Sequence, residues 1–144
     1  MATLQKQAID ALIVALNTAR PATVPEATRL RQVQNERESL PAISVYPGNE
    51  TVKPATNRPG PLVRRDALLV VECRVAGDEP DVLLDPLLVW ATAAVTSAVS
   101  PLWHDVQEVE TRFQFTIGEV PMGLAQVLFL INYQTRRTSR EAAA

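Results

Sequence analysis

The sequence predicts an α+β domain in which two helices pack on a single antiparallel or mixed sheet of four to five strands. Apolar residues recur every three or four positions over residues 4–16 and again over residues 87–98, which is the spacing of amphipathic helices. Apolar and polar residues alternate over residues 107–117, which is the pattern of a half-buried strand. Helices together with adjacent strands of this kind favour one layer of helices on one antiparallel sheet.

The first helix is predicted from a run of apolar residues near the start of the chain. We expect this helix to end at Asn17, with Pro21 beyond it. A short polar strand is expected within residues 27–33, where Leu30 and Val33 are isolated apolar residues. The apolar positions of the helix are Leu4, Ala8, Ile9, Leu12, Ile13 and Leu16.

Residues 40–48 read as a short strand bracketed by prolines, with Ile43 and Val45 on one face. Residues 47–61 hold four prolines and two glycines in fifteen residues, so we expect no regular element there. The predicted loop, taken as residues 47–64, is unusually long for a compact domain, and such loops are normally functional or disordered.

Residues 65–76 are predicted to form a strand, and Gly77 follows it. Asp85 and Pro86 are expected to open the second helix, because aspartate caps free N–H groups and proline at the first helical position loses no hydrogen bond. Ser100 and Pro101 are expected to end it. Its apolar stripe is Leu87, Leu88, Ala91, Ala94, Val95 and Ala98.

The end of the chain is predicted to form an antiparallel hairpin of two strands, residues 107–117 and 125–133, joined by a turn at 118–123. The polar residues 135–144 are expected to be a flexible tail. One face of the sheet is predicted to be the core face, and it carries Val71, Phe113, Phe115, Phe129 and Ile131.

Length and composition limit the function classes. The 144 residues predict a single domain covering the whole chain, and the formal net charge of −2 argues against a general nucleic-acid or membrane-surface binder. No apolar stretch approaches the roughly 18 residues that a membrane span needs. The first residues lack the apolar core of a signal peptide, and a single cysteine leaves a reducing cytosol as the expected compartment.

Few residues could carry catalysis, a cofactor or a metal, and we predict none of these. One histidine, His104, and one cysteine, Cys73, give no zinc spacing. Cys73 lies in an apolar strand and is expected to be a buried, unreactive thiol. Glu108 and Glu110 are two apart on a strand, and a solvated strand face explains them without acid–base chemistry.

Two features point to contacts with other proteins. The face opposite the core is predicted to carry Leu68, Val70, Leu128 and Leu130, and an apolar patch of this kind marks either a subunit contact or a surface covered by the first helix. The predicted loop and its flank carry Lys53, Arg58, Arg64 and Arg65, which would suit an acidic rim on a partner.

The order of elements resembles the tail terminator (tail completion) proteins of long-tailed, non-contractile bacteriophages, the group that includes the lambda minor tail protein U. The strings that carry the resemblance are Ala8-Ile9-Asp10-Ala11-Leu12, Leu40-Pro41-Ala42-Ile43-Ser44-Val45-Tyr46, Leu68-Leu69-Val70-Val71-Glu72-Cys73-Arg74-Val75, Leu84-Asp85-Pro86-Leu87 and Leu128-Phe129-Leu130-Ile131-Asn132-Tyr133. The resemblance extends over nearly the whole chain but includes few sharply defining residues.

The resemblance implies a structural virion protein without cofactor or catalysis. It implies a homo-hexameric ring that caps the tail tube, stops its polymerisation and offers a surface to the head–tail connector, with genomic DNA only passing through the ring. The implied location is the virion tail, and the host cytoplasm during assembly. Three alternatives stay open: a head–tail connector or tail-tube subunit, a non-viral cytosolic α+β dimeric binding module, and an enzyme.

Overall fold

The computed structural model describes residues 3–29, 40–56, 60–98 and 105–140. In chain order the elements are α1 (Leu4–Thr18), β1 (Ala27–Arg29), β2 (Ala42–Pro54), β3 (Leu62–Ala76), α2 (Pro80–Thr96), β4 (Val106–Thr116) and β5 (Met122–Arg136). The strands form one mixed sheet in the order β1-β2-β3-β5-β4, in which only the β1–β2 pair is parallel. Two helices on one five-stranded sheet confirm the predicted α+β class.

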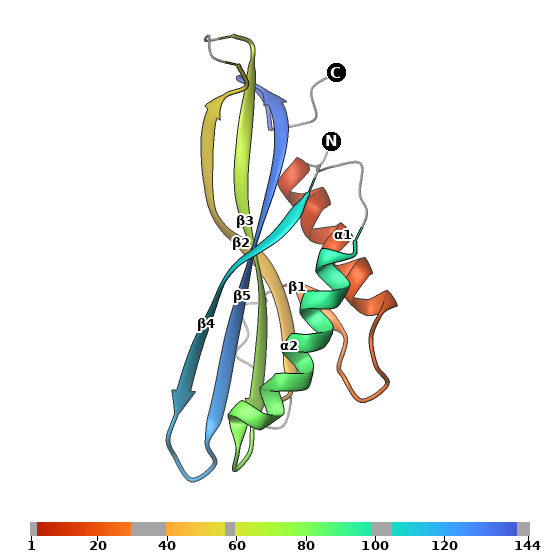
Figure 1. The fold of residues 1–144 in the computed structure, drawn as a ribbon, viewed down its shortest axis with the longest axis vertical. Helices are drawn as coiled ribbons and strands as arrows, with labels where there is room; N and C mark the ends of the chain where they lie inside the picture. Colours follow the sequence, from red (N-terminus) through yellow and green to blue (C-terminus); the bar gives the residue numbers. More distant parts are fainter. Residues whose placement is uncertain (1–2, 30–39, 57–59, 99–104, 141–144) are drawn as a thin grey trace.

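Both helices pack on the same face of the sheet. Figure 1 shows the sheet as a long, strongly twisted ribbon with α1 and α2 on one side of it. The core lies between the helices and this helix-covered face, where side chains such as Leu12, Leu84 and Phe129 are fully buried. Below, the face that lies away from the helices is called the open face.

The predicted first helix is confirmed. The Thr3 hydroxyl accepts a hydrogen bond from the Lys6 backbone N–H, which caps the start of α1. Near its end, the Asn17 side chain bonds both backbone groups of Ala27, at 2.8 and 3.2 Å, and so fixes β1 against the helix. β1 covers the first part of the expected strand at 27–33, and residues 30–33 lie outside the described part of the chain.

The predicted long loop over residues 47–64 is wrong. Strand β2 continues to Pro54 and β3 begins at Leu62, so they pair as a hairpin with a bulge between Pro47 and Glu50. The prolines are tolerated because β1 pairs only with Ile43 to Val45, and the rest of β2 forms an edge of the sheet where a missing N–H breaks no ladder bond.

The second helix begins earlier than predicted. α2 starts at Pro80 and contains Pro86 within it, and its first backbone bond runs from the Leu83 N–H to the Glu79 carbonyl at 3.2 Å. The chain offers two proline start signals, Glu79-Pro80 and Asp85-Pro86, and the first of them starts the helix.

The end of the chain is more ordered than a flexible tail over residues 135–144 would be. Thr135 and Arg136 belong to β5, and the Arg140 carbonyl accepts a hydrogen bond from the Leu4 N–H at 3.1 Å. This bond joins the two ends of the described chain. Residues 141–144 lie outside the described residues.

Candidate functional site

The structure brings together the four residues of the predicted apolar patch. Leu68 lies directly opposite Leu130, and Val70 lies directly opposite Leu128, on the adjacent antiparallel strands β3 and β5. All four lie on the open face, since their neighbours Leu69, Val71, Val127 and Phe129 form part of the core under the helices.

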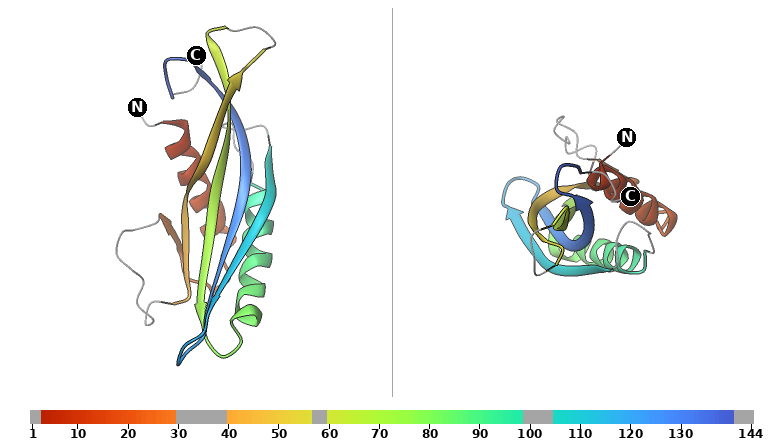
Figure 2. Two further views of the ribbon diagram at one scale, coloured as in Figure 1. Left: turned by 90° about the vertical axis from the view of Figure 1, so that its left-hand side faces the viewer. Right: turned by 90° about the horizontal axis from the view of Figure 1, so that it is seen from above.

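The alternative that the first helix covers this patch is wrong. Figure 2 (left) shows the sheet in front and both helices behind it. The patch is nevertheless smaller than predicted, because Val70 and Leu128 are each only 5% exposed. Gly48, in the bulge of β2, lies close to Leu68 and Val70, since an added Cβ would be 3.1 Å from the Leu68 Cβ and 3.5 Å from a Val70 methyl carbon. Leu68 and Leu130 remain half-buried and available for contact.

A buried polar network borders the patch on the open face. The Glu72 carboxylate accepts hydrogen bonds from the Tyr46 hydroxyl at 2.9 Å, the Gln126 amide at 3.2 Å and the Arg74 Nε at 2.7 Å. Burial, followed by the hydrogen bond to Glu72, raises the pKa of Tyr46 to about 12. Because each group has its partner, the network fixes the twist of three neighbouring strands rather than offering a free reactive group.

Of the four basic residues expected to contact a partner, the structure describes Lys53, Arg64 and Arg65, and these three do not form one exposed surface. Lys53 and Arg64 lie opposite each other near one end of the β2–β3 hairpin, and both approach Asp66, at 3.8 and 3.1 Å. Their side chains are exposed. Arg58 lies outside the described residues.

Arg65 is not a surface residue, which corrects the prediction for it. Its side chain is 8% exposed, its Nε donates to the Thr135 hydroxyl at 2.8 Å, and its guanidinium lies 3.7 Å from Glu50. Glu50 also accepts hydrogen bonds from the Tyr133 hydroxyl at 2.5 Å and from Arg140 at 2.6 Å. Burial alone would raise the pKa of Glu50, but these hydrogen bonds and the two arginine charges outweigh it and hold the pKa below its ordinary value.

The outward face of α2 is an apolar surface that the sequence analysis missed. Val82 is 58% exposed and Val89 is 65% exposed, and Pro86 and Ala93 are exposed on the same stripe, at spacings of four, three and four residues. The signal was present in the sequence, because α2 is apolar on all sides and carries only two charges, Asp81 and Asp85. A helix that is apolar all round is normally buried on all sides.

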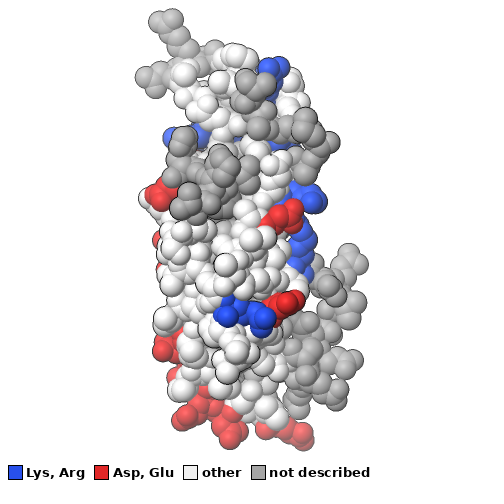
Figure 3. All heavy atoms as spheres, turned by 90° about the vertical axis from the view of Figure 1, so that its right-hand side faces the viewer, with Lys and Arg blue, Asp and Glu red and all other residues white. Residues whose placement is uncertain are grey.

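Charge is distributed unevenly over the side of the molecule that bears the helices. Figure 3 shows this side as mostly uncharged, with Asp and Glu gathered at the lower end, where α2 begins and the β4–β5 hairpin turns in Figure 1. The sequence has seven Asp and Glu and no Lys or Arg between Val75 and Thr111. A partner that covers the α2 stripe therefore meets little competing charge except at this acidic end.

The two phenylalanines predicted for the core are exposed. Phe113 and Phe115 lie opposite Ala125 and Gly123 on the helix-covered face, but β4 is the outermost strand, and they are 54% and 49% exposed. Their rings stack with centroids 6.2 Å apart. The alternating pattern predicted the strand correctly, but α2, which packs against β4, covers these rings incompletely.

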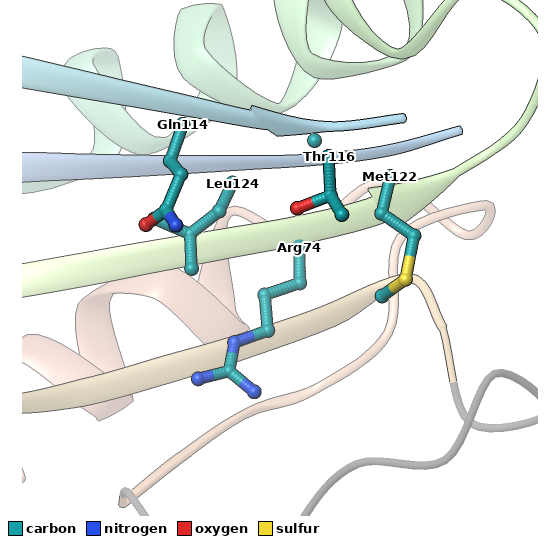
Figure 4. Close-up of a pocket in the computed structure, with 6 residues that line it drawn as sticks. Arg74, Gln114, Thr116, Met122 and Leu124 are labelled. Carbon is teal, nitrogen blue, oxygen red and sulfur yellow. The ribbon is translucent and has the colours of Figure 1, made fainter. Parts of the chain in front are cut away.

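The open face also holds a shallow pocket of about 140 Å³ near the turn of the β4–β5 hairpin. Figure 4 shows Arg74, Gln114, Thr116, Met122 and Leu124 around it, on the side of the strands away from the helices. A few polar groups around a space of this size make a water site or a packing defect, and the pocket is too small for most metabolites.

Cys73 is fully buried, as predicted, and burial followed by the nearby Glu72 raises the pKa of its thiol to about 12. His104 lies outside the described residues. Within the described ranges, no three His, Cys, Asp or Glu side chains converge as metal ligands would. Neither of the two described helices is both long and apolar enough to cross a membrane.

Comparisons with known proteins give a similarity to solved structures alone. No protein-family model matches the chain, and no curated protein matches it. Among solved structures, a chain of the virion of a native gene transfer agent particle is similar in fold, with a TM-score of 0.46, 15% sequence identity and 92% of each chain covered. At this TM-score the similarity carries no argument about function.

Proposed function

We propose that the protein is a structural subunit of a phage tail, which forms a hexameric ring, caps the tail tube and presents a docking surface to the head–tail connector. The sequence resemblance to tail terminator proteins supports this function. The distribution of apolar surface supports it independently, and one observation carries it.

That observation is that the helices cover only one face of the sheet, while both outer layers of the molecule carry apolar residues. On one side are Leu68 and Leu130 of the open face, and on the other are Val82 and Val89 of α2. Two different, complementary surfaces on opposite sides of one subunit favour a head-to-tail contact, which closes into a ring when successive subunits are related by a suitable rotation. In this ring the α2 stripe of each subunit packs on the open face of the next.

Lys53 and Arg64 are proposed to contact the tail tube. They lie at one end of the open face, and Asp66 neutralises only part of their charge. Exposed basic residues steer an acidic partner and make the encounter sensitive to salt more than they add affinity. Reversing both charges is therefore expected to slow capping most at low ionic strength.

The experiment that tests the function mixes the protein with purified tail-tube subunits and measures tube lengths by electron microscopy. The wild-type protein should shorten the tubes and sit at one end, and Val89→Glu should abolish this effect while leaving the fold intact, because Val89 is exposed. Ile117→Glu is the matched control, since Ile117 is 96% exposed and belongs to neither surface. Tubes that incorporate the protein along their length would instead identify a tube subunit, and no effect on tubes would reject the proposal.

A further inference from the structure

The outer edge of β4 has no partner among the described residues. β4 pairs only with β5, and its eleven residues contain no proline or glycine. Val109, Phe113 and Phe115 on this strand are each about half exposed. An unpaired edge strand is a template for pairing with another strand, and native proteins often blunt such an edge with charges and bulges. β4 carries three charged residues and a bulge, so a strand that pairs with it has to match these charges.

The charges of β4 are ordered in a way that selects a partner. Glu110 and Arg112 are next to each other on the open face, and the guanidinium binds the carboxylate through two bonds of 2.9 and 3.1 Å. Both side chains are at least half exposed. When two copies of such a strand pair antiparallel, the acidic residue of each copy can lie opposite the basic residue of the other.

Only one register of such a pairing satisfies these charges. In antiparallel pairing about a two-fold axis at Thr111, Glu110 of each copy lies opposite Arg112 of the other, and Val109 lies opposite Phe113. Moving the axis to Glu110 or to Arg112 places identical charges directly opposite each other, which is unfavourable. The same charges that oppose other registers therefore favour this one.

We infer that β4 docks against β4 of a second copy of this chain, antiparallel and about a two-fold axis at Thr111, to form a continuous ten-stranded sheet. The quartet of two Glu110 and two Arg112 side chains then alternates in sign on the open face. The contact is isologous, whereas the proposed ring is head-to-tail, so the inference concerns the free subunit and stands whether or not the protein caps tails.

The bulge between Glu108 and Glu110 limits this contact. Beyond it, β4 is in regular register with β5 only from Glu110 to Thr116. A bulge increases local twist and interrupts a ladder, so the shared ladder is short. A small interface of this kind gives a reversible dimer that dissociates on dilution.

The test measures the self-association of the full chain by sedimentation velocity over a range of concentrations. The wild type should form a dimer. Arg112→Glu places carboxylates opposite each other at two symmetric positions and should weaken the dimer about tenfold or more. The double variant Glu110→Arg/Arg112→Glu restores opposite charges and should restore the dimer. A wild type that stays monomeric, or an Arg112→Glu variant that dimerises as the wild type does, would overturn the inference.

A disulfide experiment tests the register directly. Cysteine in place of Thr111 lies opposite itself across the two-fold axis and should form a covalent dimer on oxidation. Cysteine in place of Thr116 lies five residues from the axis, beyond the short shared ladder, and should not. Native Cys73 is fully buried, so it should not form a disulfide between copies. Equal cross-linking at both positions, or at position 116 alone, would refute the register, and circular dichroism verifies that each variant is folded. A negative result in these tests would reject the β4 dimer but would not bear on the tube-capping proposal, which has its own assay.

Discussion

Val70 and Leu128 face each other across β3 and β5 on the side of the sheet that neither helix covers, yet each is only 5% exposed. Val70 and Leu128 therefore stabilise the fold of the subunit, while their neighbours Leu68 and Leu130 remain available for contact.

Leu128→Glu is expected to unfold the subunit or to destabilise it by about 3–5 kcal/mol, because it removes buried apolar area and buries an unpaired charge. Urea denaturation measures the free energy of unfolding. Gln134→Glu on the exposed side of the same strand is the control and should change it little. A Leu128→Glu variant as stable as the wild type would mean that this face opens to water.

Cys73 should resist thiol reagents in the native protein and react rapidly once the chain is unfolded. The reason is that the raised pKa, about 12, leaves almost no thiolate, and the sulfur is shielded from solvent. The rate of modification by a chromogenic disulfide reagent, with and without denaturant, checks this. Rapid modification under native conditions would contradict it and reopen a nucleophilic role for this residue.

Glu50→Gln should lower stability at neutral pH, because the charged carboxylate joins Arg65, Arg140 and Tyr133. The native pKa of Glu50 lies below its ordinary value of 4.5, so the stabilisation is present above that value and is lost as the pH falls through the native pKa. The difference in unfolding free energy between wild type and variant should therefore shrink below about pH 4.5. A difference that does not vary with pH would show that the carboxylate is not ionised in this cluster.

Gly123→Ala should destabilise the subunit by roughly 1–3 kcal/mol through overpacking. An added Cβ at Gly123 would lie 2.8 Å from the Pro80 Cβ and 3.3 Å from a Phe115 ring carbon, so the start of α2 and β4 must shift. Gly118→Ala is the control, because its nearest contact would be 3.9 Å away. Thermal melts compare the two variants, and equal melting temperatures would show that this packing adjusts without cost.

Sequence periodicity predicted most strands and both helices, because it reports which residues share a face. It could not say how far a neighbouring element reaches, so Phe113 and Phe115 were assigned to the core although α2 leaves half of each exposed. Proline content misled the prediction over residues 47–64, since Pro47 and Pro54 fit an edge strand as well as a loop. Arg65 was placed on the surface because its partners Glu50 and Thr135 are distant in sequence.

The central claim is that the α2 stripe of one subunit contacts the open face of the next. Two proteins with one added cysteine each test it most directly, one with Val89→Cys and one with Leu68→Cys, assembled together on tail tubes and treated with a short bis-maleimide; native Cys73 is buried in both. The account predicts mixed 89–68 dimers, formed only when both proteins are present. Like-with-like dimers, or no cross-linked product on tubes that are capped normally, would contradict it.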